Sequence, residues 1–169
     1  MLKAVILDNQ AVARNLLSSV LTTGGHEIVG DGNTSPAVLA RIVKLKPQIV
    51  CVDIGETNQE GLTLLDTLRS ELPKALIFLV SAKIDAPTLQ AAQERGVQGF
   101  IVKPFNSVAV LASIRNTIIR IAKQQASKPT DAAVDIASDT ASNAASDAVT
   151  SSVTSSVPNA DSQDSAKKG

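Results

Sequence analysis

Hydrophobic and polar residues alternate along the first 125 positions in a way that predicts strands and helices in turn. Short runs that are apolar on both faces, such as 49–52, indicate buried strands. Between them apolar residues recur every three or four positions, as at Val12, Leu16 and Val20, which is typical of amphipathic helices. Strands are expected near 3–7, 27–29, 49–52, 76–80 and 99–102, and helices near 12–22, 36–45, 62–72, 86–95 and 107–124.

Five strand–helix units in about 120 residues predict an α/β fold with a doubly wound parallel sheet. The flavodoxin-like version of this fold has strand order 2-1-3-4-5, which makes the first and third strands neighbours. Open sheets of this kind bind ligands beyond the carboxyl ends of those strands, where the order reverses. We therefore expect the functional residues at that edge.

Composition narrows the class of protein further. Of 169 residues 44% are hydrophobic, and the three aromatic residues are all Phe, so the core must be largely aliphatic. The single cysteine, Cys51, excludes an intramolecular disulfide, and its place in a strand favours inert packing. No signal peptide or membrane-length apolar run is visible, and the formal net charge is zero. These features predict a cytoplasmic protein with neither a membrane nor a nucleic-acid partner.

The composition changes near Ala126. Residues 126–169 contain 10 Ala, 10 Ser and 6 Asp, with neither Leu nor Phe. Such a segment buries too little apolar surface to offset the entropy lost on ordering. We expect a domain over 1–125 and a disordered tail over 126–169, either an inert extension or a tether for a partner.

Two acids, a serine and a lysine stand at the carboxyl ends of four strands. Asp8 and Asp53 end the first and third, Ser81 follows the fourth, and Lys103 follows the fifth. Two carboxylates suit Mg²⁺, and a lysine ammonium suits a phosphate-like dianion. Together with a hydroxyl donor, these groups fit phosphoryl transfer with Asp53 as the nucleophile.

At this point the sequence resembles a known family. Residues 2–124 are similar to a receiver domain of two-component response regulators, most like the single-domain chemotaxis type. The matching stretches are 6–9 (Ile-Leu-Asp-Asn) with Arg14, 49–53 (Ile-Val-Cys-Val-Asp) followed by Gly61 and Leu62, 79–82 (Leu-Val-Ser-Ala) and 99–105 (Gly-Phe-Ile-Val-Lys-Pro-Phe).

The resemblance implies a role for each matching residue. Asp53 would accept a phosphoryl group from a sensor histidine kinase, and Lys103 would pair with that group. Asp8, Asp53 and the backbone carbonyl of Gly55 would bind Mg²⁺, with Asn9 as a further candidate ligand. Such a protein is a signalling module rather than an enzyme.

The resemblance also implies a switch and an output surface. Ser81 would bond the phosphoryl oxygens and move on activation, and Phe100 would turn inward in the active form. The peptide bond before Pro104 is similar to a cis bond of the family. An unknown output protein would bind over residues 86–124.

Several residues depart from the family pattern. Asn9 replaces the second of two adjacent acids, which should weaken Mg²⁺ binding. Thr57 stands in place of a proline, and Gly55 and Lys83 occupy positions that tune phosphoryl lifetime. These departures keep open an alternative, a phosphorylation-independent interaction module. The stretch from Asp53 to Thr57 also echoes the nucleophile motif of a phosphatase class, without its second aspartate.

Some of these residues also have purely structural interpretations. Asn9 could cap the first helix, Ser81 could be a turn former, and Phe100 could simply pack in the core. His26, the single histidine of the chain, is expected at the surface.

Overall fold

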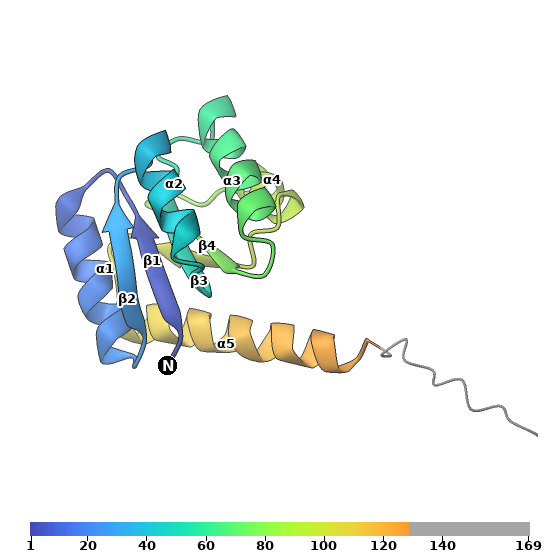
Figure 1. Ribbon diagram of the computed structural model, residues 1–169. Coiled ribbons are helices and arrows are strands. Elements are labelled where there is room, and N and C mark those ends of the chain that lie inside the picture. Colours follow the sequence, from blue (N-terminus) through green and yellow to red (C-terminus); the bar gives the residue numbers. More distant parts are fainter. Residues whose placement is uncertain (129–169) are drawn as a thin grey trace, which may run out of the picture. The chain divides into compact units, whose positions relative to one another are not determined.

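The computed structural model describes residues 1–128, so residues 129–169 of the predicted tail over 126–169 lie outside the described residues. One sheet of five parallel strands has the order β2-β1-β3-β4-β5, which confirms the predicted topology (Figure 1). The elements are β1 (Lys3–Leu7), α1 (Ala11–Thr23), β2 (Glu27–Gly32), α2 (Pro36–Lys44), β3 (Ile49–Asp53), α3 (Gln59–Glu71), β4 (Leu76–Ser81), α4 (Ala86–Glu94), β5 (Gly99–Val102) and α5 (Ser107–Ala126).

Two hydrophobic clusters fill the two faces of the sheet. Successive strand residues point to opposite faces, so Leu7 joins the cluster under α2, α3 and α4, whereas Ile6 joins the one under α1 and α5. Phe78 is the largest fully buried side chain, and the other buried residues of both clusters are aliphatic except Cys51. Cys51 is also fully buried, and burial raises the pKa of its thiol to about 12, consistent with inert packing.

Strand β2 is longer than predicted. It extends through Gly30, Asp31 and Gly32, which are poor strand formers by propensity. A Cβ atom on Gly30 would lie 2.9 Å from Ile42 Cδ1, and one on Gly32 would lie 2.6 Å from Val38 Cγ1. The two glycines therefore let α2 pack closely on this strand, a tertiary requirement that propensity does not register.

Helix ends mostly follow their capping residues. Helix α3 starts at Gln59, three residues before the predicted start, because the Asn58 side chain accepts a hydrogen bond from the Gly61 amide at 2.9 Å. Asn106 caps α5 in the same way through the Ala109 amide at 3.0 Å. Helix α5 then continues to its last residue one position past the expected domain boundary.

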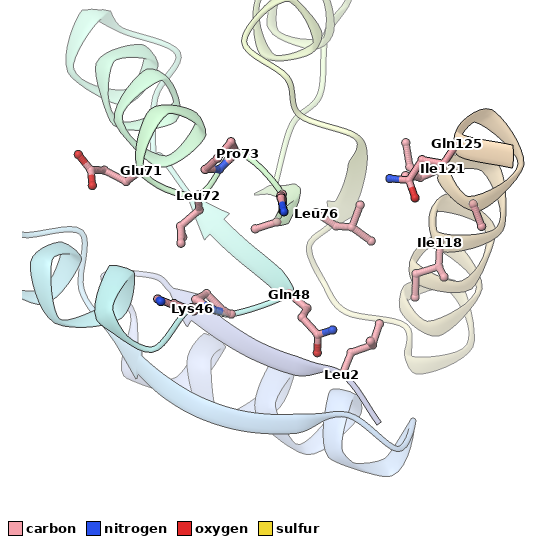
Figure 2. A pocket seen from close by; sticks show the side chains of 14 residues that line it. Leu2, Lys46, Gln48, Glu71, Leu72, Pro73, Leu76, Ile118, Ile121 and Gln125 are labelled. Carbon is pink, nitrogen blue, oxygen red and sulfur yellow. The ribbon is translucent and has the colours of Figure 1, made fainter. Parts of the chain in front are cut away.

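A groove of about 610 Å³ opens at the amino-terminal ends of the strands (Figure 2). Leu2 and Leu76 line it from the strand starts, and Ile118 and Ile121 line it from α5. It lies at the edge opposite to the predicted functional residues. Within residues 1–128, no helix combines the length and the apolarity needed to cross a membrane.

Candidate functional site

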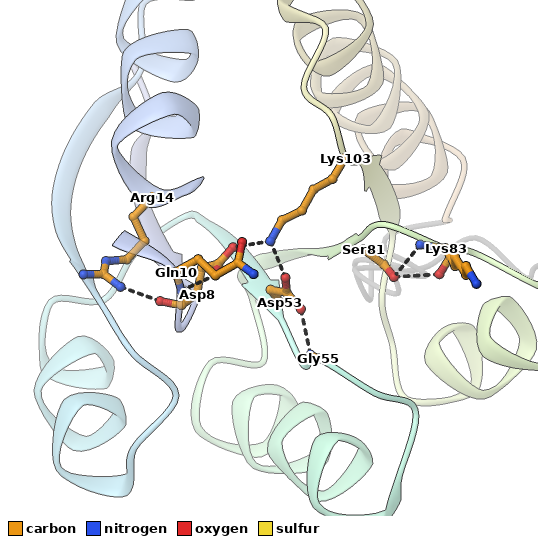
Figure 3. Close-up of polar contacts among 8 residues, drawn as sticks. All are labelled: Asp8, Gln10, Arg14, Asp53, Gly55, Ser81, Lys83 and Lys103. Atoms are coloured by element: carbon orange, nitrogen blue, oxygen red, sulfur yellow. Dashed lines mark hydrogen bonds and ion pairs between the residues drawn. The ribbon is translucent and has the colours of Figure 1, made fainter. Parts of the chain in front are cut away.

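Three charged side chains meet at the carboxyl edge of the sheet. Lys103 Nζ donates hydrogen bonds to Asp8 Oδ2 at 2.7 Å and to Asp53 Oδ2 at 2.5 Å (Figure 3). All three are largely buried: the exposed side-chain fraction is 15% for Lys103, 5% for Asp8 and 15% for Asp53. Charges removed from water to this degree must compensate one another, and this cluster pairs one ammonium with two carboxylates.

The strand order explains the meeting of these residues. Strands β1 and β3 are hydrogen-bonded neighbours with Leu7 opposite Val52, so Asp8 and Asp53 come side by side. Lys103 follows β5, with β4 between β5 and β3. Its long flexible side chain spans that gap to both carboxylates. The site thus lies at the predicted reversal of strand order.

Electrostatics keeps Lys103 charged. Burial by itself lowers the pKa of the Lys103 ammonium, but its hydrogen bonds to Asp53 and Asp8 and their negative charges raise it. The net pKa lies above the ordinary value for lysine. Lys103 is therefore a permanent cation of this site at neutral pH.

The second oxygen of each carboxylate is held by backbone. Asp8 Oδ1 accepts a hydrogen bond from the Gln10 amide at 2.7 Å, and Asp53 Oδ1 accepts one from the Gly55 amide at 2.7 Å. Gly55 has φ of 71°, a left-handed conformation that favours glycine. Both carboxylates are thus fixed in orientation as well as in position.

Arg14 also holds Asp8 in place, although the search for residues at the strand ends gave Arg14 no role. Its guanidinium donates to the backbone carbonyl of Asp8 at 2.6 Å and pairs with Asp31 of β2 at 3.0 Å. The signal was present as an arginine six residues after Asp8, one turn into α1. Its contacts depend on the position of β2, which the sequence placed less well.

Ser81, Asn9 and Phe100, which were predicted as site residues, lie apart from this cluster. Ser81 Oγ donates to the Lys83 carbonyl at 2.6 Å, so its hydroxyl faces its own turn (Figure 3). Asn9 Oδ1 accepts hydrogen bonds from the amide and the hydroxyl of Thr34, both at 3.2 Å. The interpretation of Asn9 as a helix cap is wrong, because Gln10 occupies the N-cap position of α1.

Phe100 is half-buried on β5 and packs against the cluster under α2, α3 and α4. It lines a hollow of about 370 Å³ formed by α4, β5 and α5, and its carbonyl accepts a hydrogen bond from Ser113 at 3.0 Å. The predicted cis peptide between Lys103 and Pro104 is confirmed.

The donor chemistry fits magnesium. Mg²⁺ is typically held by one or two carboxylates and keeps several waters, and Asp8 and Asp53 supply two carboxylates at one point. The Lys103 ammonium already bridges these two carboxylates as a cation. No group of three or more acidic, histidine or cysteine side chains suited to a metal occurs in residues 1–128. The fit therefore depends on the two carboxylates and nearby carbonyl oxygens.

Comparison with known proteins identifies the class. The model of the response regulator receiver domain matches residues 4–115, so the chain belongs to the response regulator receiver family. It is a receiver domain of two-component signalling, a system in which a histidine kinase is the general partner. This membership makes it a signalling protein and not an enzyme, so the phosphatase interpretation is wrong.

Individual similar proteins are consistent with this family assignment. Chemotaxis protein CheY of Thermotoga maritima is 28% identical over 112 residues, which cover 66% of this chain and 93% of that protein. A protein-glutamate methylesterase/protein-glutamine glutaminase of Archaeoglobus fulgidus is 26% identical over 127 residues, which cover 75% of this chain but 36% of that longer protein. The crystal structure of a response regulator from Thermotoga maritima has a TM-score of 0.64 at 21% identity, covering 70% of this chain and 98% of that one, and shares the fold.

Proposed function

We propose that Asp53 accepts a phosphoryl group from a histidine kinase and that the modified chain signals by protein–protein contact. The observation that carries this proposal is the bridging of Asp53 and Asp8 by the buried Lys103 ammonium. Such a pairing places a carboxylate nucleophile beside a fixed cation that suits a phosphoryl dianion.

The transfer is a displacement at phosphorus. An Oδ atom of Asp53 forms a bond to the phosphorus of a phosphohistidine while the P–N bond breaks, and the imidazole leaves with that electron pair and takes up a proton. Lys103 then pairs with the oxygens of the new phosphoryl group, since its Nζ already lies within hydrogen-bond distance of Asp53.

Asp8, Asp53 and the carbonyl of Gly55 are the residues that would hold Mg²⁺ in this chain. When bound, the ion supplies positive charge that offsets the charge on the phosphoryl oxygens. Asn9 would join them only by releasing Thr34, because Thr34 now occupies its side-chain oxygen.

Ser81 and Phe100 are the proposed switch residues, and residues 86–124 the proposed output surface. Ser81 can turn from Lys83 toward a phosphoryl oxygen, since it gives up contacts only within its own turn. In the proposed output region, β5 leaves Val102 55% exposed and α5 leaves Val108 77% exposed. We propose that these two exposed apolar side chains contact the output protein.

A titration with beryllofluoride, a mimic of the phosphoryl group, tests this function. Amide NMR spectra are recorded with Mg²⁺ alone and then with beryllofluoride, for the wild type and for Asp53→Ala. We expect Mg²⁺-dependent beryllofluoride shifts at Asp53, Ser81, Phe100 and Lys103 in the wild type and none in the variant. Unchanged spectra at millimolar Mg²⁺ would refute the proposal.

A second candidate function is a constitutive interaction module that works without phosphorylation. The contacts of Asn9 with Thr34 and of Ser81 with Lys83 favour it, because both keep predicted site residues away from Asp53. An output partner that binds wild type and Asp53→Ala equally, with or without beryllofluoride, would support this candidate over the first.

A further inference from the structure

Two threonine hydroxyls join the loop after Asp53 to helix α4. Thr57 Oγ1 lies 2.8 Å from Thr88 Oγ1, across 31 residues of sequence. We propose that this pair, the Thr57–Thr88 latch, couples the conformation of loop 54–58 to the position of α4. The part of this proposal that concerns phosphorylation rests on the proposed function of Asp53.

Helix α4 is attached to the rest of the domain by few buried groups. Of its nine residues Thr88 and Ala92 are buried, and Leu89 and Ala91 are half-buried. At its other end Arg95 pairs with Asp66 of α3 at 3.4 Å, with Asp66 59% exposed. An ion pair exposed to this extent adds little stability. The hydroxyl contact, the Asp85 cap and the half-buried Leu89 together hold the first turn of α4.

Thr88 of the latch is also hydrogen-bonded to the N-cap residue of α4. Asp85 is the N-cap residue, and its Oδ1 accepts a hydrogen bond from the Thr88 amide at 2.9 Å. Hydrogen bonds from the Thr88 hydroxyl and amide lower the pKa of the Asp85 carboxyl. Either threonine hydroxyl can donate in the Thr57–Thr88 contact, and the Thr88 amide joins the same residue to the cap at Asp85.

The loop side of the latch starts at the proposed phosphorylation site. The Gly55 amide donates to Asp53 Oδ1, so a change at that carboxylate acts directly on the loop. Residues 55–58 of the loop are exposed, and the loop meets the start of α3 at Gly61, where a Cβ would lie 2.9 Å from the Glu56 carbonyl oxygen. The hydroxyl contact of Thr57 with Thr88 is the side-chain hydrogen bond that joins this exposed loop to α4. Thr57 is two residues beyond Gly55 and carries a displacement of the loop to Thr88.

The test begins with hydrogen exchange of the unliganded full chain. Thr57→Val removes the hydroxyl and keeps the side-chain shape, whereas Thr57→Ser keeps the hydroxyl. Thr63→Val is the control, because it removes a hydroxyl that bonds only within α3. We expect Thr57→Val to speed exchange of the Leu89 amide about fivefold, the equivalent of one net hydrogen bond. Thr57→Ser and Thr63→Val should exchange as the wild type does.

A double-variant comparison makes the test specific to the pair. Thr88→Val should speed α4 exchange as Thr57→Val does, and the double variant should exchange no faster than either single variant, because both remove the same contact. Additive effects of the two substitutions, or unchanged α4 exchange in Thr57→Val, would overturn the proposal.

A beryllofluoride arm separates this proposal from the proposed function. With Mg²⁺ and beryllofluoride, Thr57→Val should keep the wild-type shifts at Asp53 and Gly55 and lose most of those over α4. Full retention of the α4 shifts would count against the latch. A wild type that does not respond at all would refute the proposed function of Asp53, and the exchange rates of the unliganded chains would then decide the latch by themselves.

Discussion

Lys103 sets the charge of the site, since it places one ammonium between two buried carboxylates and leaves one negative charge uncompensated. A site with that balance attracts a cation less strongly than one with a third acid. Asn9, next to Asp8 in the chain, is the position at which a third acid is absent. Position 9 is therefore the single residue expected to change the affinity of the proposed site for Mg²⁺.

Asn9→Asp should raise the affinity for Mg²⁺ by about tenfold or more, because it adds a unit charge beside Asp8 in a partly desolvated site. Isothermal titration of both proteins with Mg²⁺ measures the change. Asn116→Asp is the matched control, since it adds the same charge on an exposed face of α5. Equal affinities for the wild type and Asn9→Asp would show that position 9 does not influence the metal.

Sequence reasoning found Asp8, Asp53 and Lys103 because each ends or follows a buried strand, and parallel strands bring their ends together. It could not find the partners of Asn9 and Ser81. Short polar side chains choose among several local hydrogen bonds, and that choice depends on how a neighbouring loop lies. In this chain Asn9 bonds to Thr34, and Ser81 bonds to the Lys83 backbone.

At the scale of helices and strands, some glycines allow neighbouring elements to pack closely, and one histidine is half-buried between two elements. Gly99 of β5 faces Phe78 of β4, and a Cβ there would clash with ring carbons of Phe78 and lie 3.0 Å from Thr117 Oγ1. His26 lies between α1 and β2, and its Nδ1 is buried with no hydrogen-bond partner among residues 1–128. His26 is thus half-buried rather than at the surface as predicted.

Gly99→Ala should destabilise the domain by about 1–3 kcal/mol, the usual cost of overpacking a core. Urea unfolding followed by circular dichroism measures the free energy of unfolding. The double variant Phe78→Leu/Gly99→Ala should lose less than the sum of the two single losses, because the smaller side chain relieves the clash. A strictly additive double variant would show that the ring and the new methyl do not meet.

His26 should make the domain less stable as the pH falls below about 6.5. Burial, with a smaller effect of the N-terminal charge, lowers the pKa of His26 from its ordinary value of 6.5. The unfolded chain therefore binds the proton more readily, and the stability present above pH 6.5 is lost as the pH drops toward the folded-state pKa. Urea unfolding of wild type and His26→Gln between pH 5 and 8 measures this. The pH dependence in that window should be weaker in the variant, and identical profiles would contradict the assignment.

At the scale of the whole molecule, the site and the large apolar groove lie at opposite edges of one sheet. Both hydrophobic clusters draw their buried residues from positions 4–114, and α5 supplies the last of them at Ile114. Residues 129–169 contain neither Leu nor Phe, so by composition they offer little apolar surface for burial.

Residues 1–128 should therefore fold with the same urea midpoint as the full chain. Circular dichroism during urea unfolding compares the two. A shorter chain that ends at residue 113 is the control, since it lacks the fully buried Ile114 and should lose cooperative unfolding. A midpoint for 1–128 well below that of the full chain would show that residues 129–169 stabilise the domain.

The order of strands and helices, the two-sided core and the edge that carries the acids and the lysine all followed from the sequence alone. Each depends on local patterns: apolar runs, helical spacing and the residue at the end of each strand. Only the tertiary structure decided how far β2 runs, which hydroxyls and amides pair, and that Thr57 meets Thr88. Those outcomes depend on contacts between residues far apart in the chain, where packing selects among hydrogen bonds of similar energy.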